Sequence, residues 1–193
     1  MKDTLNFDWL YIVKSKDQNL CLISWDTRMG GSMIEYATMA LFKDSNNQLK
    51  SRLLIDSTDK HLSNSYMHYD TIYTVNQKDE IFYLAQGFGQ GSSSLPWQEI
   101  KALEIKNNKL IDLRIFPDYS PDIFGDFTPG FQNKLFVEFD LHKFGDNDKV
   151  PEIRLQDKGK TILVPLPTHE EGFSGKYQRL IFKDGNYHVK QYK

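Results

Sequence analysis

The chain has 193 residues, 24 basic and 26 acidic side chains, and a formal net charge of −2. Its size fits one domain. Hydrophobic residues make up 39% of the chain and charged residues 26%, a composition that is typical of globular proteins and excludes wholesale disorder. The chain lacks the basic excess typical of nucleic-acid-binding proteins and any stretch long enough to cross a membrane. We therefore expect neither a nucleic-acid partner nor membrane insertion.

Cys21 is the only cysteine, so no disulfide within the chain and no cysteine-based metal site is expected. It lies in the apolar run Leu20–Ile23 and is interpreted as a small buried hydrophobe. The first residues of the chain contain no apolar signal sequence. The expectation is either a cytoplasmic protein or an exported one whose signal has been removed.

Strand signals dominate the start of the chain. Two β-rich runs, Leu10–Val13 and Leu20–Trp25, flank the polar turn Lys16–Asn19 and predict a hairpin. Met33–Phe42 predicts a third strand, and Leu49–Ile55 is expected to pair back on it.

The strand pattern restarts after a polar loop at 57–65. Residues 66–75 predict a strand in which one face carries Tyr69, Thr71, Tyr73 and Val75. Ile81–Ala85 predicts the returning strand. The glycine- and serine-rich stretch Gly87–Ser94 then indicates a flexible strand connection.

The second half of the chain also predicts strands. Trp97–Ile105 fits a strand, although its spacing tolerates a short helix, and the Asn107–Asn108 turn leads into Leu110–Phe116. A stretch rich in proline and glycine, 117–130, is the clearest break. Beyond it, strands are predicted at 135–141, 152–155, 161–164, 177–182 and 187–191.

These elements predict an all-β fold, an antiparallel meander of roughly ten to twelve strands with little helix. The strands fall into three units of about four strands each, at 9–57, 69–116 and 135–191. A repeat of four strands about every 50 residues is typical of propeller blades. Three blades do not close a usual propeller, so a propeller-like arrangement, a rolled sheet and a barrel are alternatives. We expect a single β domain over 1–193, with sub-sections 1–116 and 131–193 joined by the loop 117–130.

The segment 24–32 is the first candidate site. Trp25 offers a stacking surface, Asp26 and Arg28 offer polar anchors, and Gly30 and Gly31 leave room for a ligand near the backbone. The alternative is a plain hairpin loop, in which Asp26 accepts its own turn amides and the glycines adopt positive φ.

The same segment is part of a resemblance that spans most of the chain. The motif Ser24-Trp25-Asp26-Thr27 with Gly30-Gly31, the strand Phe82-Tyr83-Leu84 and the ending Phe182 to Tyr187 resemble a family of often exported β-rich proteins of Bacteroidetes-type bacteria. The resemblance implies a truncated, envelope-associated protein. It carries over no catalytic residue.

The second candidate site is the stretch from Gly87 to Trp97. It has the glycines of an anion-binding loop but lacks the Lys-Ser/Thr pair and the following helix of a P-loop. The alternative to a plain connection is a carbohydrate- or peptide-facing loop with Phe88 and Trp97 as stacking surfaces. A cleft shared by Trp25 and Trp97 would support a binding function.

No metal site, cofactor or catalytic residue is predicted. Two groups of acidic residues could supply calcium ligands, but neither has the spacing of a calcium-binding loop. The first, in the proline-rich loop, is Asp118, Asp122 and Asp126, and the second, after Gly145, is Asp146 and Asp148. None of the five histidines has a zinc-ligand spacing, and no Gly-x-Ser-x-Gly elbow occurs.

The leading hypothesis is a non-enzymatic, monomeric binding protein of the bacterial cell envelope, whose loops contact a protein or a glycan. One version is an immunity-type protein that neutralises a toxin. The first alternative is a hydrolase in whose pocket at least two of Asp26, His68 and His169 converge. The other is a structural envelope component with a flat surface.

Overall fold

The computed structural model describes residues 5–7, 9–54, 67–77, 80–117, 132–144, 149–166 and 172–190. These residues form three antiparallel sheets and two short 3₁₀ turns, Leu141–Lys143 and Asp157–Gly159. No sheet closes into a barrel within the described part of the chain. The all-β antiparallel fold with little helix is therefore confirmed.

The N-terminal sheet is a meander in chain order. Its strands are β1 (Leu5–Phe7), β2 (Leu10–Lys14), β3 (Leu20–Asp26), β4 (Tyr36–Lys43) and β5 (Leu49–Leu54). The predicted β2–β3 hairpin and the return of β5 onto β4 are both confirmed. β4 begins at Tyr36 and not at Met33, because the residues before it form a loop.

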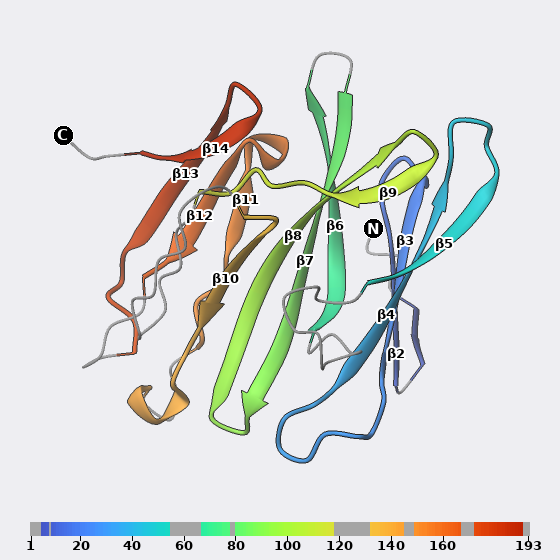
Figure 1. Cartoon of the computed structure of the whole chain (residues 1–193). Helices are drawn as coiled ribbons and strands as arrows, with labels where there is room; N and C mark the ends of the chain where they lie inside the picture. The colour runs from blue at the N-terminus through green and yellow to red at the C-terminus, as the bar shows by residue number, and fades with distance from the viewer. Residues whose placement is uncertain are drawn as a thin grey trace.

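The central sheet has the order β10-β8-β7-β6, with β9 also paired to β8. Its strands are β6 (Met67–Gln77), β7 (Glu80–Ser92), β8 (Leu95–Lys106), β9 (Lys109–Asp112) and β10 (Lys134–Glu138). The C-terminal sheet consists of β11 (Arg154–Gln156), β12 (Thr161–Pro165), β13 (Tyr177–Lys183) and β14 (Asn186–Val189). Figure 1 shows the three sheets side by side, with the central sheet in the middle.

The three predicted units correspond to the three sheets, apart from β10. This strand was expected in the third unit, but it pairs with β8 of the central sheet. β9 covers only one end of the long strand β8, from Leu103 to Lys106. The rest of this edge of β8 would leave amide and carbonyl groups without partners. β10 satisfies them by pairing with Trp97–Lys101 of β8. The break at 118–131, between β9 and β10, lies outside the described residues.

The central sheet is buried on both faces, which produces two cores. Leu84 and Ile100 pack with Ile162 and Leu180 of the C-terminal sheet. Their neighbours on the opposite face, including Tyr83 and Leu103, pack with side chains of the N-terminal sheet such as Leu22 and Phe42. The molecule is thus a stack of three sheets whose middle layer supplies apolar side chains to both cores.

A β-bulge in β6 changes which face its side chains occupy. Tyr69 pairs with Gly87, but Thr71 pairs with Gln86, so Asp70 is an extra residue. Tyr69 therefore lies in the core with the N-terminal sheet, while Val75 lies in the other core. The expectation that Tyr69 and Val75 share a face was wrong, because the bulge interrupts the alternation.

The stretch Gly87–Ser94 is not a flexible connection, because β7 continues to Ser92 and only Ser93 and Ser94 form the turn. Its glycines make room for close neighbours. A Cβ at Gly87 would overlap the carbonyl oxygen of His68, and a Cβ at Gly91 would lie 2.6 Å from the ring of Trp97. These are strand positions in which a side chain would not fit.

Side chains from the N-terminal sheet satisfy backbone groups of β6. Ser24 Oγ lies 2.8 Å from Thr38 Oγ1 and accepts a hydrogen bond from the Tyr69 amide at 3.3 Å. Thr38 Oγ1 donates to the carbonyl of Met67 at 3.3 Å. All of these groups are buried. The network fixes the N-terminal sheet against the edge of the central one.

Candidate interaction surface

Trp25 and Asp26 end β3, and the loop that follows has the features of a plain turn. Asp26 Oδ1 accepts a hydrogen bond from the Arg28 amide at 2.7 Å. Thr27 donates its amide to the Glu35 carbonyl at 2.9 Å, which closes the base of the loop. Asp26 is thus used to satisfy its own turn, as in the hairpin interpretation.

Arg28, not a glycine, has the positive φ in this loop, at 58°. Its guanidinium lies 4.3 Å from the ring centroid of Trp9, a cation–π contact at the surface. The positive φ expected at Gly30 and Gly31 was wrong, since neither is among the positive-φ glycines. Gly30 is required for a different reason, because a Cβ there would overlap the carbonyl oxygen of Met33. Gly31 faces open space.

Phe88 and Trp97 lie in the central sheet and not in a loop. Trp97 packs on Phe136 with 5.7 Å between ring centroids, and its indole N–H donates to the sulfur of Met67 at 2.6 Å. Phe88 and Trp97 both line a cavity of about 210 Å³. Trp25 lines neither this cavity nor two others lined by described residues, of about 290 and 430 Å³, so none of these three is a cleft shared by Trp25 and Trp97.

The two candidate segments nevertheless meet. Gln90 Nε2 donates a hydrogen bond to the carbonyl of Ser32 at 3.1 Å, so the β3–β4 loop contacts β7 close to Gly91. Figure 1 shows this loop and the β7–β8 turn at the same end of the molecule. The Trp25 side chain does not take part in this contact, because it lies on the outward side of the N-terminal sheet.

Trp25 belongs to a surface that was not predicted from the sequence. In β3, Leu20, Leu22 and Ser24 point into the core and are buried, so the alternate residues point outward. The strand register extends this outward set across four strands. We call the set the outer face: Leu10, Ile12, Lys14, Cys21, Ile23, Trp25, Ala37, Met39, Leu41, Lys43, Leu49, Ser51 and Leu53.

The outer face is apolar over most of its area. Its only charged residues, Lys14 and Lys43, lie at the end that is remote from Trp25. Apart from Ala37, which is buried, its apolar residues are half-buried or exposed, with Leu53 39% and Leu49 70% exposed. Cys21 is half-buried here, so the expectation that it is a core residue was wrong. Burial raises the pKa of its thiol.

The outward face of the C-terminal sheet, at the other side of the stack, carries both polar and apolar side chains. Its strand positions alternate with the core residues Ile162 and Leu180 and include Arg154, Gln156, Arg179, Lys183 and His188. Seven large hydrophobic side chains are exposed among the described residues, and five of them lie instead in or beside the N-terminal sheet: Trp9, Met29, Met33, Leu49 and Leu53. The apolar surface is therefore concentrated on one side of the molecule.

His68 lies in an aromatic cluster beneath the N-terminal sheet. Its ring stacks on Tyr11 at 4.2 Å between centroids and lies 4.9 Å from that of Tyr36. Burial lowers the pKa of His68 to about 4, and its Nδ1 has no hydrogen-bond partner among the described residues. Burial, with Tyr11 and Asp26 nearby, raises the pKa of Tyr36 to about 12. A catalytic histidine needs an orienting acceptor, which this geometry does not supply.

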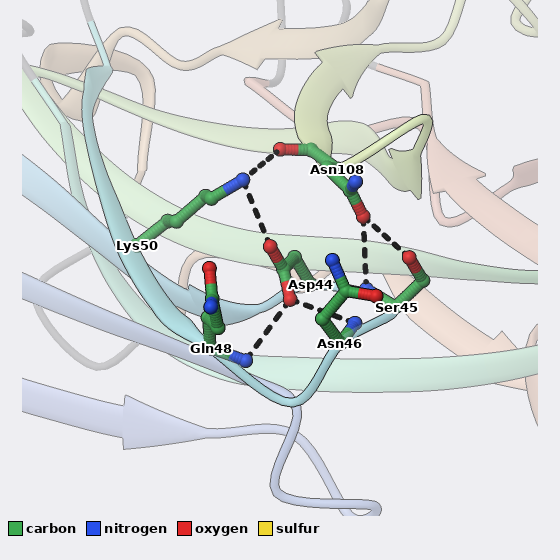
Figure 2. Close-up of polar contacts among 6 residues, drawn as sticks. All are labelled: Asp44, Ser45, Asn46, Gln48, Lys50 and Asn108. Atoms are coloured by element: carbon green, nitrogen blue, oxygen red, sulfur yellow. Dashed lines mark hydrogen bonds and ion pairs between the residues drawn. The ribbon is translucent and has the colours of Figure 1, made fainter.

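A groove of about 430 Å³ lies where the β4–β5 and β8–β9 turns meet. Figure 2 shows Asp44 at the centre of its polar contacts: it accepts the amides of Asn46 and Gln48, at 2.8 and 2.9 Å, and pairs with Lys50 at 2.8 Å. Lys50 and these amides lower the pKa of Asp44. Asn108 accepts from Ser45 and links the two turns. These groups satisfy one another, as expected of a structural contact.

Among the described residues, no group of three or more His, Cys, Asp or Glu side chains could hold a metal ion. His169, the acids of the proline-rich loop and those after Gly145 lie outside the described residues. The described part of the chain also has no helix with the length and hydrophobicity needed to span a bilayer.

Comparisons of the chain with family models, with curated proteins and with solved structures found no match. The resemblance to exported β-rich proteins stays a prediction.

Proposed function

We propose that this protein is a non-enzymatic binding protein and that the outer face of the N-terminal sheet is its contact surface. The observation that supports the proposal is the contrast between the two sides of the stack. One outward face is apolar across four strands, whereas the other alternates charged residues such as Arg154, Arg179 and Lys183 with apolar ones such as Leu163 and Ile181. A large apolar patch on a folded domain is typical of an interaction site.

The strands of the N-terminal sheet support this interpretation. A strand with one solvated face alternates apolar and polar residues, whereas β3 and β4 are apolar at most positions on both faces. The same pattern occurs over residues 81–85 of β7, a strand that is covered on both faces. β3 and β4 thus have the composition of strands that are covered on both sides.

The rim of the surface adds the features of a binding site. Trp25 ends the outer face, and Trp9, 56% exposed, lies next to its cross-strand partner Leu10. Arg28 stacks over Trp9, and Met29 is 78% exposed in the same loop. Tryptophan, methionine and arginine are the residues enriched at protein interfaces.

The experiment is affinity capture from a lysate of the source organism with three baits. The wild type is compared with Ile23→Lys at the centre of the outer face and with Ile181→Lys, a matched control on the outward face of the C-terminal sheet. Partners held by the wild type and the control but lost with Ile23→Lys support the proposal. Partners retained by all three baits contradict it.

A further inference from the structure

We infer that the occupant of the outer face is a second copy of this chain, packed face to face through the N-terminal sheets. The inference rests on the proposed function, because it names the partner of the same surface. It departs from the monomer expected from the sequence, since the outer face becomes visible only when four strands are placed in register.

The shape of the surface favours another sheet. A sheet face is broad and gently twisted, and small-molecule sites are concave with a few converging polar groups. Ser51 is the only uncharged polar residue of the outer face, so a glycan would find few hydrogen-bond partners there. A second sheet needs none, because two apolar sheet faces pack about 10 Å apart by side-chain contact alone. The molecule already uses this packing twice in its own stack.

The size of the surface is sufficient for a dimer. Four strands about 4.8 Å apart, each of about seven residues at ~3.3 Å, cover roughly 450 Å² in projection. Side-chain relief and the rim at Trp9 and Met29 enlarge the accessible area, so two copies would bury on the order of 1,200 Å². This is the lower end of the range of stable protein interfaces.

The charges select one arrangement. Lys14 and Lys43 lie at one end of the outer face and Trp25 at the other. A two-fold axis along the strands would place the lysines of both copies together, which repulsion disfavours. A two-fold axis across the strands places the lysines of one copy at the Trp25 end of the other, where ammonium groups and indole rings attract. Ile23, in the middle of the central strand β3, then lies near the axis.

Sedimentation velocity over a concentration series tests the inference with the wild type, Ile23→Lys and Ile181→Lys. We expect the wild type and Ile181→Lys to dimerise, and we expect Ile23→Lys to weaken dimerisation by about a hundredfold or more, because it would bury an unpaired charge. A wild type that stays monomeric up to about 100 μM overturns the inference. A dimer unaffected by Ile23→Lys overturns it as well.

A second measurement applies if Ile23→Lys does not fold. In a Cys21→Ser background, Ile23→Cys should be joined to its copy by a bis-maleimide that spans about 10 Å, whereas Ile181→Cys should not. Equal cross-linking of the two variants contradicts the inference.

The failure of this inference is distinct from that of the proposed function. If the wild type is monomeric and its captured partners are lost with Ile23→Lys, the outer face is a binding surface, but its occupant is another molecule and not a second copy. A monomeric wild type that sediments with anionic phospholipid vesicles through Ile23 would make a lipid surface the occupant, which also overturns the second copy.

Discussion

Ile23 of β3 and Met39 of β4 lie directly opposite each other on the side of the N-terminal sheet that faces away from the core. Their chain neighbours Leu22 and Ala40 form the matching pair on the core side and are fully buried. One pair stabilises the fold, and the other is available to a partner. This division leads to a first prediction.

Leu22→Ala and Ile23→Ala should differ sharply in their effect on stability. Leu22→Ala leaves a cavity in a packed core and should lower the free energy of unfolding by about 2–5 kcal/mol. Ile23→Ala removes a half-solvated side chain and should cost less than about 1 kcal/mol in the monomer. Urea denaturation at a protein concentration low enough to keep the chain monomeric measures both. Equal costs would mean that the outer face is covered within the monomer.

The buried hydroxyl network should contribute to the contact between the N-terminal sheet and β6. Ser24→Ala removes an acceptor of the Tyr69 amide, and Thr38→Val removes the donor to the Met67 carbonyl. Each substitution should cost about 1–3 kcal/mol, because buried polar groups lose a partner. The double variant should cost less than the sum, since the two hydroxyls bond each other. Strict additivity in denaturation experiments would show that they act separately.

His68 should make stability depend on pH. Its pKa is lowered from 6.5 to about 4 by burial, so the folded state favours the neutral ring. The stability it contributes is complete above pH 6.5 and is lost as the pH falls from there toward 4, by a total on the order of 3 kcal/mol.

The measurement is the difference in unfolding free energy between the wild type and His68→Phe from pH 7.5 to 4. Subtracting the variant removes the contribution of the acidic side chains. The wild type should lose stability relative to His68→Phe across this window. A difference that stays constant with pH would show that His68 has the same pKa in the folded and the unfolded states, which contradicts the lowering by burial.

Gly30 and Gly31 provide a matched pair of neighbours. Gly30→Ala places a methyl group on the carbonyl oxygen of Met33 and should destabilise the β3–β4 loop by more than about 1 kcal/mol. Gly31→Ala meets open space and should be neutral or stabilise by about 0.5 kcal/mol, because it restricts the unfolded chain. Thermal unfolding of the two variants compares them directly. The reverse order would contradict the loop geometry described above.

Local signals in the sequence predicted much of the fold. The Asn107–Asn108 turn is an example, since both residues adopt the positive φ that such a hairpin requires, at 52° and 61°. Features set by distant contacts were not predictable. Gly87 and Gly91 suggested a loop because the sequence does not reveal that His68 and Trp97 occupy the space beside them. The bulge at Asp70 likewise leaves no local pattern.

The candidate site was predictable only in part. Trp25 was predicted to lie at the end of a strand, and β3 does end at Trp25 and Asp26, but the companions of Trp25 were sought in loops. The available signal was the run Leu20–Trp25, which is apolar at both outward and inward positions except Ser24. Such a run does not indicate which of the two faces of the strand is covered by other parts of the same chain. That information comes only from the arrangement of the sheets.

A second copy that covers the outer face would also cover Cys21, the single thiol of the chain, which lies within that face. The most direct test is the rate at which Cys21 of the unmodified protein reacts with a maleimide as protein concentration rises. We predict a rate that falls by about tenfold or more across the dimerisation range, while Ile181→Cys in a Cys21→Ser background reacts at a constant rate. A Cys21 rate that is the same at every concentration would show that no second copy covers the outer face.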